Sequence, residues 1–128
     1  MYEIRIAHKA DGKALIQFID QHWKKDHIFV TCKELLDWQH LDQMRERYNF
    51  VIGIERQTKA IHGVLGFIPL AQFDPEMELG RLCWMAIWKV QDAARGHKLG
   101  RLLLSYLEDT IKPDILSTVA ASAMSLPI

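Results

Sequence analysis

The sequence has no excess of charge of either sign, because its 16 basic side chains are balanced by 16 acidic ones. A protein without net charge has no overall field that would attract a nucleic acid or an anionic membrane. The composition therefore argues against nucleic-acid binding and against attachment to a membrane surface. Any site for an anion has to be built locally, from a few residues.

Cysteines are few and long hydrophobic runs are lacking. Cys32 and Cys83 lie far apart in the sequence, and isolated thiols are typical of a reducing compartment, although one disulfide between them stays open. Apolar runs such as 82–88 are much shorter than the about 18 residues of a membrane span. The first residues alternate in polarity and lack the apolar stretch of a signal peptide. These absences predict a soluble cytoplasmic protein.

The first part of the chain carries the pattern of one strand and two helices. Its 128 residues, 49% of them hydrophobic, suffice for one domain with a hydrophobic core. Alternation predicts an opening strand over 2–7. Asp11 is placed to cap the first helix, and a second helix is predicted to begin at Thr31 with Glu34 completing a capping box. Trp38 belongs to the predicted buried stripe of that second helix.

The second part of the chain changes to strand patterns. Residues 50–54 and 61–68 are rich in strand formers and are joined by a short polar link, which predicts an antiparallel hairpin. The apolar stretch 82–90 is typical of a strand covered on both faces. Helical spacing predicts a helix from Leu99 onwards, and 115–121 is a candidate for a further strand.

The segment 88–101 indicates a function, because a strand leads there through a glycine-containing turn into a helix. The first turn of a helix presents unpaired amides and partial positive charge, which suit a phosphate group. Gly96 would allow a ligand close to the backbone, and Gly100 would allow the helix to lie close to the sheet. The turn also adds local cations: Arg95, Lys98 and Arg101. Taken alone, a glycine before a helix is more often an ordinary turn.

The same segment resembles the cofactor-binding motif of the GNAT N-acetyltransferases. Val90 is followed, after four residues, by Arg95-Gly96-His97-Lys98-Leu99-Gly100 and then by a run of leucines. The family pattern has a small residue where Lys98 stands, so either that amide is presented less closely or the lysine itself meets a phosphate. The order of predicted elements also resembles this fold, although only 90–104 is specific.

The resemblance implies an α/β (α+β) fold with a mixed, largely antiparallel sheet flanked by helices. Residues 1–128 would form a single domain that lacks the family's C-terminal helix and strands. Acetyl-CoA would be the co-substrate, with no metal, and the acceptor a primary amine of a small molecule such as an amino sugar. The implied cofactor-binding residues are Trp88, Lys89 and Val90 along the pantetheine arm, and Arg95, Gly96, His97, Lys98, Leu99, Gly100 and Arg101 around the pyrophosphate.

The catalytic base and acid stay unassigned. In the family the amine attacks the thioester carbonyl directly, a backbone amide polarises that carbonyl, and a late tyrosine often protonates the thiolate. The stretch that would hold this tyrosine is absent here, and Tyr106 is predicted to pack on the motif helix. Acidic residues before the third strand are candidates for the base, although a solvated loop is the commoner arrangement: Asp74, Glu76 and Glu78.

Other chemistry-bearing residues have simpler interpretations. His97 is expected to face solvent, His62 to be a hydrogen-bonded structural histidine, and Cys83 to be a small core residue. Trp84 and Trp88 are predicted to be mainly core, with one of them a candidate for lining the acceptor pocket. The histidines and cysteines show no metal-ligand spacing.

Two alternatives to an active enzyme remain open. The first is a regulatory module that binds CoA without doing chemistry, which the missing C-terminal portion makes reasonable. The second is a nucleotide-binding or nucleic-acid-binding α/β domain, against which the neutral charge counts.

The last predicted strand would leave an unpaired sheet edge, so the chain is expected to self-associate. Light scattering at rising protein concentration should therefore report a mass above that of the monomer. A mass that stays monomeric at high concentration would contradict this expectation.

Overall fold

The computed structural model describes residues 2–69, 82–92, 98–111 and 115–118. Within these residues the strands form a six-stranded sheet in the order β1-β3-β4-β5-β6, with the short β2 paired to β3. Neighbouring strands are antiparallel except for β5 and β6, which are parallel. This is the predicted mixed, largely antiparallel sheet. The strands are β1 Tyr2–His8, β2 Leu41–Asp42, β3 Arg47–Glu55, β4 Ile61–Pro69, β5 Leu82–Val90 and β6 Ile115–Thr118.

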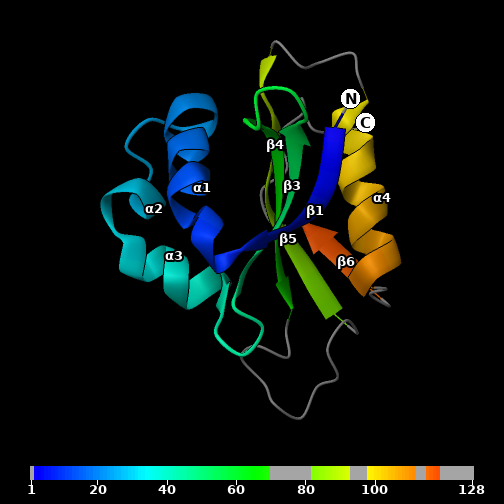
Figure 1. The fold of residues 1–128 in the computed structure, drawn as a ribbon. Helices are drawn as coiled ribbons and strands as arrows, with labels where there is room; N and C mark the ends of the chain where they lie inside the picture. The colour runs from blue at the N-terminus through cyan, green and yellow to red at the C-terminus, as the bar shows by residue number, and fades with distance from the viewer. Residues whose placement is uncertain (1, 70–81, 93–97, 112–114, 119–128) are drawn as a thin grey trace.

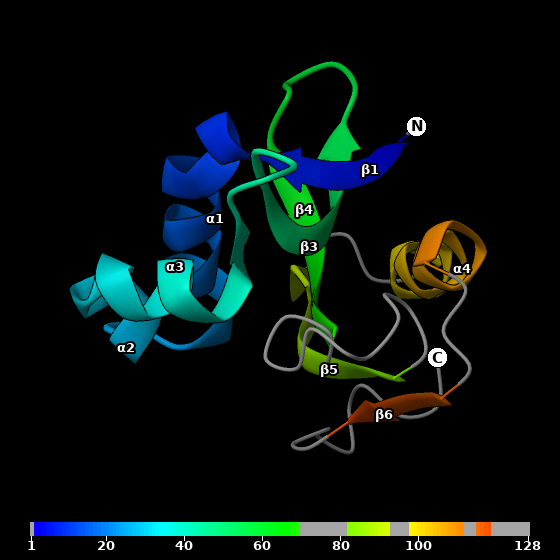
Figure 2. The same cartoon turned by 90° about the horizontal axis from the view of Figure 1, so that it is seen from below.

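Helices cover both faces of this sheet (Figure 1). One face carries the helical segments that follow β1, and the other carries the long helix α4, as the view along the sheet also shows (Figure 2). None of the described helices is long and apolar enough to cross a membrane. The helical segments are η1 Lys9–Asp11, α1 Gly12–Phe18, η2 Ile19–Trp23, α2 Ile28–Thr31, α3 Lys33–His40 and α4 Leu99–Ile111.

Alternation along the strands builds one hydrophobic core on each face. On β3, Phe50 and Ile52 belong to the cluster under α1–α3, whereas Val51 between them belongs to the cluster under α4. Successive side chains of a strand point to opposite faces, so a strand buried on both faces is apolar throughout. On α4 the residues at helical spacing, Leu99, Leu103 and Leu107, are all fully buried or nearly so. The opening strand, the hairpin, the 82–90 strand and the helix from Leu99 are thus confirmed.

Three predictions for the first helical region are wrong. Thr31 ends the short helix α2 instead of beginning a helix, and α3 begins two residues later, so no capping box forms with Glu34. The Asp11 carboxylate makes no cap to α1; it accepts from the His8 amide at 2.7 Å and from the Arg5 guanidinium at 2.8 Å. Trp38 is 64% exposed. The buried residues of α3 are Leu36 and His40, one helical turn apart, so Trp38 halfway between them lies on the opposite, exposed face of the helix.

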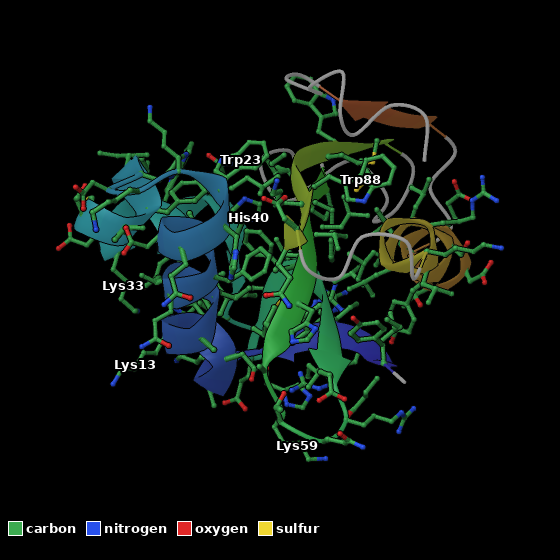
Figure 3. All side chains as sticks on the ribbon, turned by 90° about the horizontal axis from the view of Figure 1, so that it is seen from above. Lys13, Trp23, Lys33, His40, Lys59 and Trp88 are labelled. Carbon is green, nitrogen blue, oxygen red and sulfur yellow. The ribbon has the colours of Figure 1, made fainter. Side chains whose placement is uncertain are left out.

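His40 is a fully buried polar residue between α3 and the sheet (Figure 3). Its ring lies 4.4 Å from the ring of Phe50 and 5.7 Å from that of Phe29, measured between centroids. Its Nδ1 donates to the Asn49 carbonyl at 3.3 Å. Burial disfavours the charged ring and lowers the pKa of His40 to about 4, although hydrogen bonds to backbone carbonyls oppose this.

This burial predicts a pH-dependent loss of stability. The unfolded chain binds a proton at His40 near pH 6.5, whereas the folded chain binds it only near pH 4. The free energy of unfolding should therefore fall between those pH values, by up to about 3 kcal/mol from this residue. Denaturant unfolding at pH 7, 5.5 and 4 measures this change.

His40→Leu should flatten this part of the pH dependence, because no proton is bound there in either state. His22→Leu, on the same side of the sheet, leaves His40 in place and should keep the wild-type slope. Equal slopes in wild type and His40→Leu would contradict the assignment.

Candidate functional site

The strand β5 contains a bulge at its middle. Leu65 of β4 pairs with Trp88, and Phe67 pairs with Met85, so Ala86 and Ile87 of β5 together oppose one residue of β4. A bulge inserts one extra residue and therefore reverses the alternation beyond it. Before the bulge the odd-numbered Cys83 and Met85 pack towards α4; after it the even-numbered Trp88 and Val90 do so.

The strand β5 is paired on both sides along its first part. Here β6 pairs with Leu82–Met85, and none of the described strands pairs with Ala86–Val90 on the side away from β4. The amide of Gln91 donates to the His62 carbonyl of β4 at 2.8 Å. Backbone groups alternate between the two sides of a strand, so those of Lys89 also face β4, while those of Trp88 and Val90 point away from it. Two of the three residues assigned to a pantetheine arm thus present backbone groups outward.

The beginning of α4 lies beside this half of β5. Lys98 precedes the helix, and its carbonyl accepts from the Leu102 amide at 3.1 Å. Its φ angle of 59° lies in the left-handed region, which glycine adopts freely and lysine rarely. Lys98, which stands where the GNAT pattern has a small residue, therefore has a backbone conformation that glycine adopts most easily. The side chain of Lys98 is exposed.

A pair of glycines on the sheet seats α4. Gly53 of β3 and Gly63 of β4 are cross-strand partners. A Cβ at Gly53 would lie 2.6 Å from Leu99 Cδ1, and a Cβ at Gly63 would lie 2.9 Å from Leu99 Cδ2. Leu99 thus fills the space that two side chains would otherwise occupy. These two sheet glycines allow the helix to approach the sheet closely, and Gly100, from which this was expected, is itself buried in the first turn of α4.

The side chain of Trp88 joins β5 to α4. Trp88 Nε1 donates to the Gly100 carbonyl, in the first turn of the helix, at 3.2 Å. In Figure 3, Trp88 lies on the α4 side of the sheet and Trp23 on the α1 side. The cationic side chain of Lys89 is close to Asp92, with Nζ 3.5 Å from Oδ1.

Three other candidates occupy the structural roles expected of them: Cys83, His62 and Tyr106. Burial raises the pKa of the Cys83 thiol to about 11, so this residue is protonated at neutral pH and is not a nucleophile. His62 is hydrogen-bonded, with Nδ1 3.2 Å from the Tyr2 hydroxyl. Tyr106 packs against the core under α4. The prediction that Trp84 is mainly core is wrong, because its side chain is 41% exposed. No group of three or more potential metal ligands is found within the described part of the chain.

Several predicted site residues lie outside the described residues, so their roles stay predictions. In the motif turn these are Arg95, Gly96 and His97, and before β5 they are Asp74, Glu76 and Glu78. The described motif residues Lys98, Leu99, Gly100 and Arg101 all lie at the beginning of α4.

Sequence comparisons give no match to a protein-family model and none to a curated protein. Solved structures do match. An arylalkylamine N-acetyltransferase-like protein from mosquito is 16% identical, with a TM-score of 0.63 over 88% of this chain and 71% of that one. The GNAT family N-acetyltransferase YhbS from Escherichia coli, solved with CoA, is 15% identical, with a TM-score of 0.60 over 86% of this chain and 56% of that one.

An aminoglycoside 6'-N-acetyltransferase from Acinetobacter baumannii is 12% identical, with a TM-score of 0.67 over 98% of this chain and 84% of that one. At these identities the likeness establishes the fold. The chain has the GNAT acetyltransferase fold, as the motif and the order of elements predicted. It spans less than two thirds of the length of the E. coli protein.

The seating of α4 predicts coupled effects of substitutions at Gly53 and Leu99. Gly53→Ala should lower the free energy of unfolding by about 1–3 kcal/mol, because the new methyl group overlaps Leu99. Leu99→Ala should destabilise by about 2–5 kcal/mol, because it leaves a cavity. In the double variant the new methyl group enters that cavity, so the two effects should fall short of additivity by at least about 0.5 kcal/mol. Denaturant unfolding of the four proteins measures this.

Gly66→Ala is the matched control. Its Cβ would lie 2.8 Å from Phe50, on the opposite face of the sheet from Leu99. Its effect should add to that of Leu99→Ala. Additivity at Gly53 as well would contradict the seating of Leu99 between the two glycines.

Proposed function

We propose that this protein is an acetyl-CoA-dependent N-acetyltransferase that acts on a primary amine of a small molecule. One observation carries the proposal: beyond its bulge, β5 presents the backbone groups of Trp88 and Val90 outward, directly beside the first turn of α4. An extended amide-containing chain that ends in phosphates matches this arrangement. The pantetheine arm of CoA is such a chain.

Each part of CoA meets a suitable group. The pantetheine amides would pair with Trp88 and Val90 as an added strand does. The pyrophosphate would lie at the N-terminus of α4, where unpaired amides and the helix dipole favour an anion. The left-handed backbone of Lys98 is one that glycine adopts easily, and its exposed ammonium adds a positive charge. An E. coli protein of the same fold was solved with CoA, which supports CoA as the ligand.

In the proposed reaction the neutral amine attacks the thioester carbon and the C–S bond breaks. An outward amide of β5 would stabilise the charge that develops on the carbonyl oxygen. The proton lost by the amine would pass to a group outside β5, because the sequence Leu82–Val90 contains no carboxylate and no histidine. The thiolate of CoA leaves and takes up a proton.

We propose a small-molecule acceptor instead of a basic protein tail, although one protein of the same fold, from Brucella melitensis, is a ribosomal-protein-alanine N-acetyltransferase. Two other proteins of the same fold are named for small amines. The A. baumannii protein is an aminoglycoside N-acetyltransferase, and the mosquito protein resembles an arylalkylamine N-acetyltransferase. On this chain, Trp23 packs against the core under α1–α3, and Trp84 of β5 is partly exposed. An amino sugar remains the proposed acceptor class.

The lack of a carboxylate and of a histidine in β5 favours one second candidate, a CoA-binding module without catalysis. The two functions differ in a simple measurement. Calorimetry should show acetyl-CoA binding in both cases. Only an enzyme should release free CoA when it is mixed with acetyl-CoA and a panel of amines, consisting of amino sugars, arylalkylamines and peptides. A chain that does not bind acetyl-CoA contradicts both.

Reversing the charge of Lys98 tests the phosphate site. Lys98→Glu should raise the dissociation constant for acetyl-CoA tenfold or more, a loss of about 1.4 kcal/mol or more, because a carboxylate would face the pyrophosphate. The fold should tolerate the change, since a negative side chain is favourable near a helix N-terminus. Calorimetric titration measures the constant.

Lys59→Glu is a closely matched control. Lys59 is also exposed and also has a positive φ, of 64°, but lies in the turn between β3 and β4. It is far from Trp88 in Figure 3. Its substitution should leave the dissociation constant unchanged. Equal losses for the two variants, or none for Lys98→Glu, would contradict the site.

A further inference from the structure

Trp88 contributes to both parts of the proposed site, the free side of β5 and the first turn of α4. Its backbone groups point away from β4 along the free side of β5, and its indole lies on the α4 face of the sheet. The indole N–H donates to the Gly100 carbonyl at 3.2 Å. The same residue therefore touches the strand edge and the first turn of the helix.

We infer that Trp88 is a positioning residue that holds the first turn of α4 at a fixed place relative to the outward backbone of β5. The inference rests on the proposed function and deepens it. A ligand that pairs with the strand and also places its pyrophosphate at the helix needs both surfaces at a constant separation. Preorganised donors stabilise a bound group most when they do not have to move on binding.

The hydrogen bond is not needed to satisfy the backbone of the helix. A carbonyl in the first turn of an α-helix already accepts from the amide four residues later. Trp88 is partly buried, and Leu99 fixes the same turn from the sheet side by filling the space above Gly53 and Gly63. The indole thus adds a second, directional attachment from β5. The two attachments lie on neighbouring residues, Leu99 and Gly100, and come from different strands.

Trp88→Phe separates this role from packing, because it keeps an aromatic ring and removes the N–H. One neutral hydrogen bond corresponds to about a five- to tenfold change in affinity. We expect the dissociation constant for acetyl-CoA to rise by about that factor, whereas the constant for S-acetylpantetheine, which lacks the pyrophosphate, should stay near its wild-type value. In turnover assays KM for acetyl-CoA should rise more than kcat falls.

The control is Trp38→Phe, the same substitution on α3, on the opposite face of the sheet (Figure 1). It should leave both dissociation constants unchanged. If Trp88→Phe does not fold, replacing Trp88 with benzothienylalanine keeps the bicyclic shape and still removes the donor.

A second readout needs no ligand. Hydrogen exchange of the amides in the first two turns of α4 should be faster in the Trp88 variant than in wild type, and unchanged in Trp38→Phe. Equal exchange in wild type and the Trp88 variant overturns the positioning role, and so does an equal loss of affinity for acetyl-CoA and S-acetylpantetheine. A wild-type chain that binds no acetyl-CoA while its Trp88 variant shows the faster exchange overturns the proposed function and leaves the attachment as purely structural.

Discussion

The contact on which the candidate site depends is that of Leu99 with Gly53 and Gly63. A helix that packs on a sheet is normally held off by the side chains of the strands beneath it. Two glycines that face each other on neighbouring strands remove that spacing at one point, and the first residue of α4 fills it. This contact fixes where α4 begins and how closely its first turn approaches the sheet, without any ligand. Phosphate binding at a helix N-terminus requires that the helix begin at a defined place.

The bulge in β5 solves a second geometric problem. Without it, Trp88 would continue the alternation of Cys83 and Met85 and would point to the opposite face from α4. With it, Trp88 reaches the Gly100 carbonyl, and the outward backbone of β5 stands beside the helix. Gly66, on β4 opposite the bulge, lies against Phe50. The bulge in β5 and the contact of Leu99 with the two glycines therefore act together. They place the outward backbone of β5 beside the first turn of α4, which neither feature would do alone.

Elements whose apolar pattern is strong could be predicted from the sequence. The 82–90 strand and the helix from Leu99 were confirmed at these positions, because burial on a sheet or on one helix face demands such patterns. The break at Cys32 between α2 and α3 was missed, since a capping box at Thr31 is a local signal that tertiary packing overrides. The bulge was missed because β5 is apolar almost throughout. A strand without alternating polar and apolar residues gives no sign of the point at which its side chains change faces. The sequence does show a glycine in each hairpin strand, Gly53 and Gly63. That the two glycines face each other under α4 depends on the register of the hairpin, which cannot be read from the sequence.

Lys98, the residue at which the sequence departs from the GNAT pattern, has a left-handed backbone. A non-glycine residue in the left-handed region costs about 1 kcal/mol or more, and the chain bears this cost at the residue before α4. A lysine with ordinary backbone angles would turn the entry into the helix and move the amides of its first turn. The observed conformation keeps the entry that glycine would give and adds a cation where the neutral composition of the chain offers little charge.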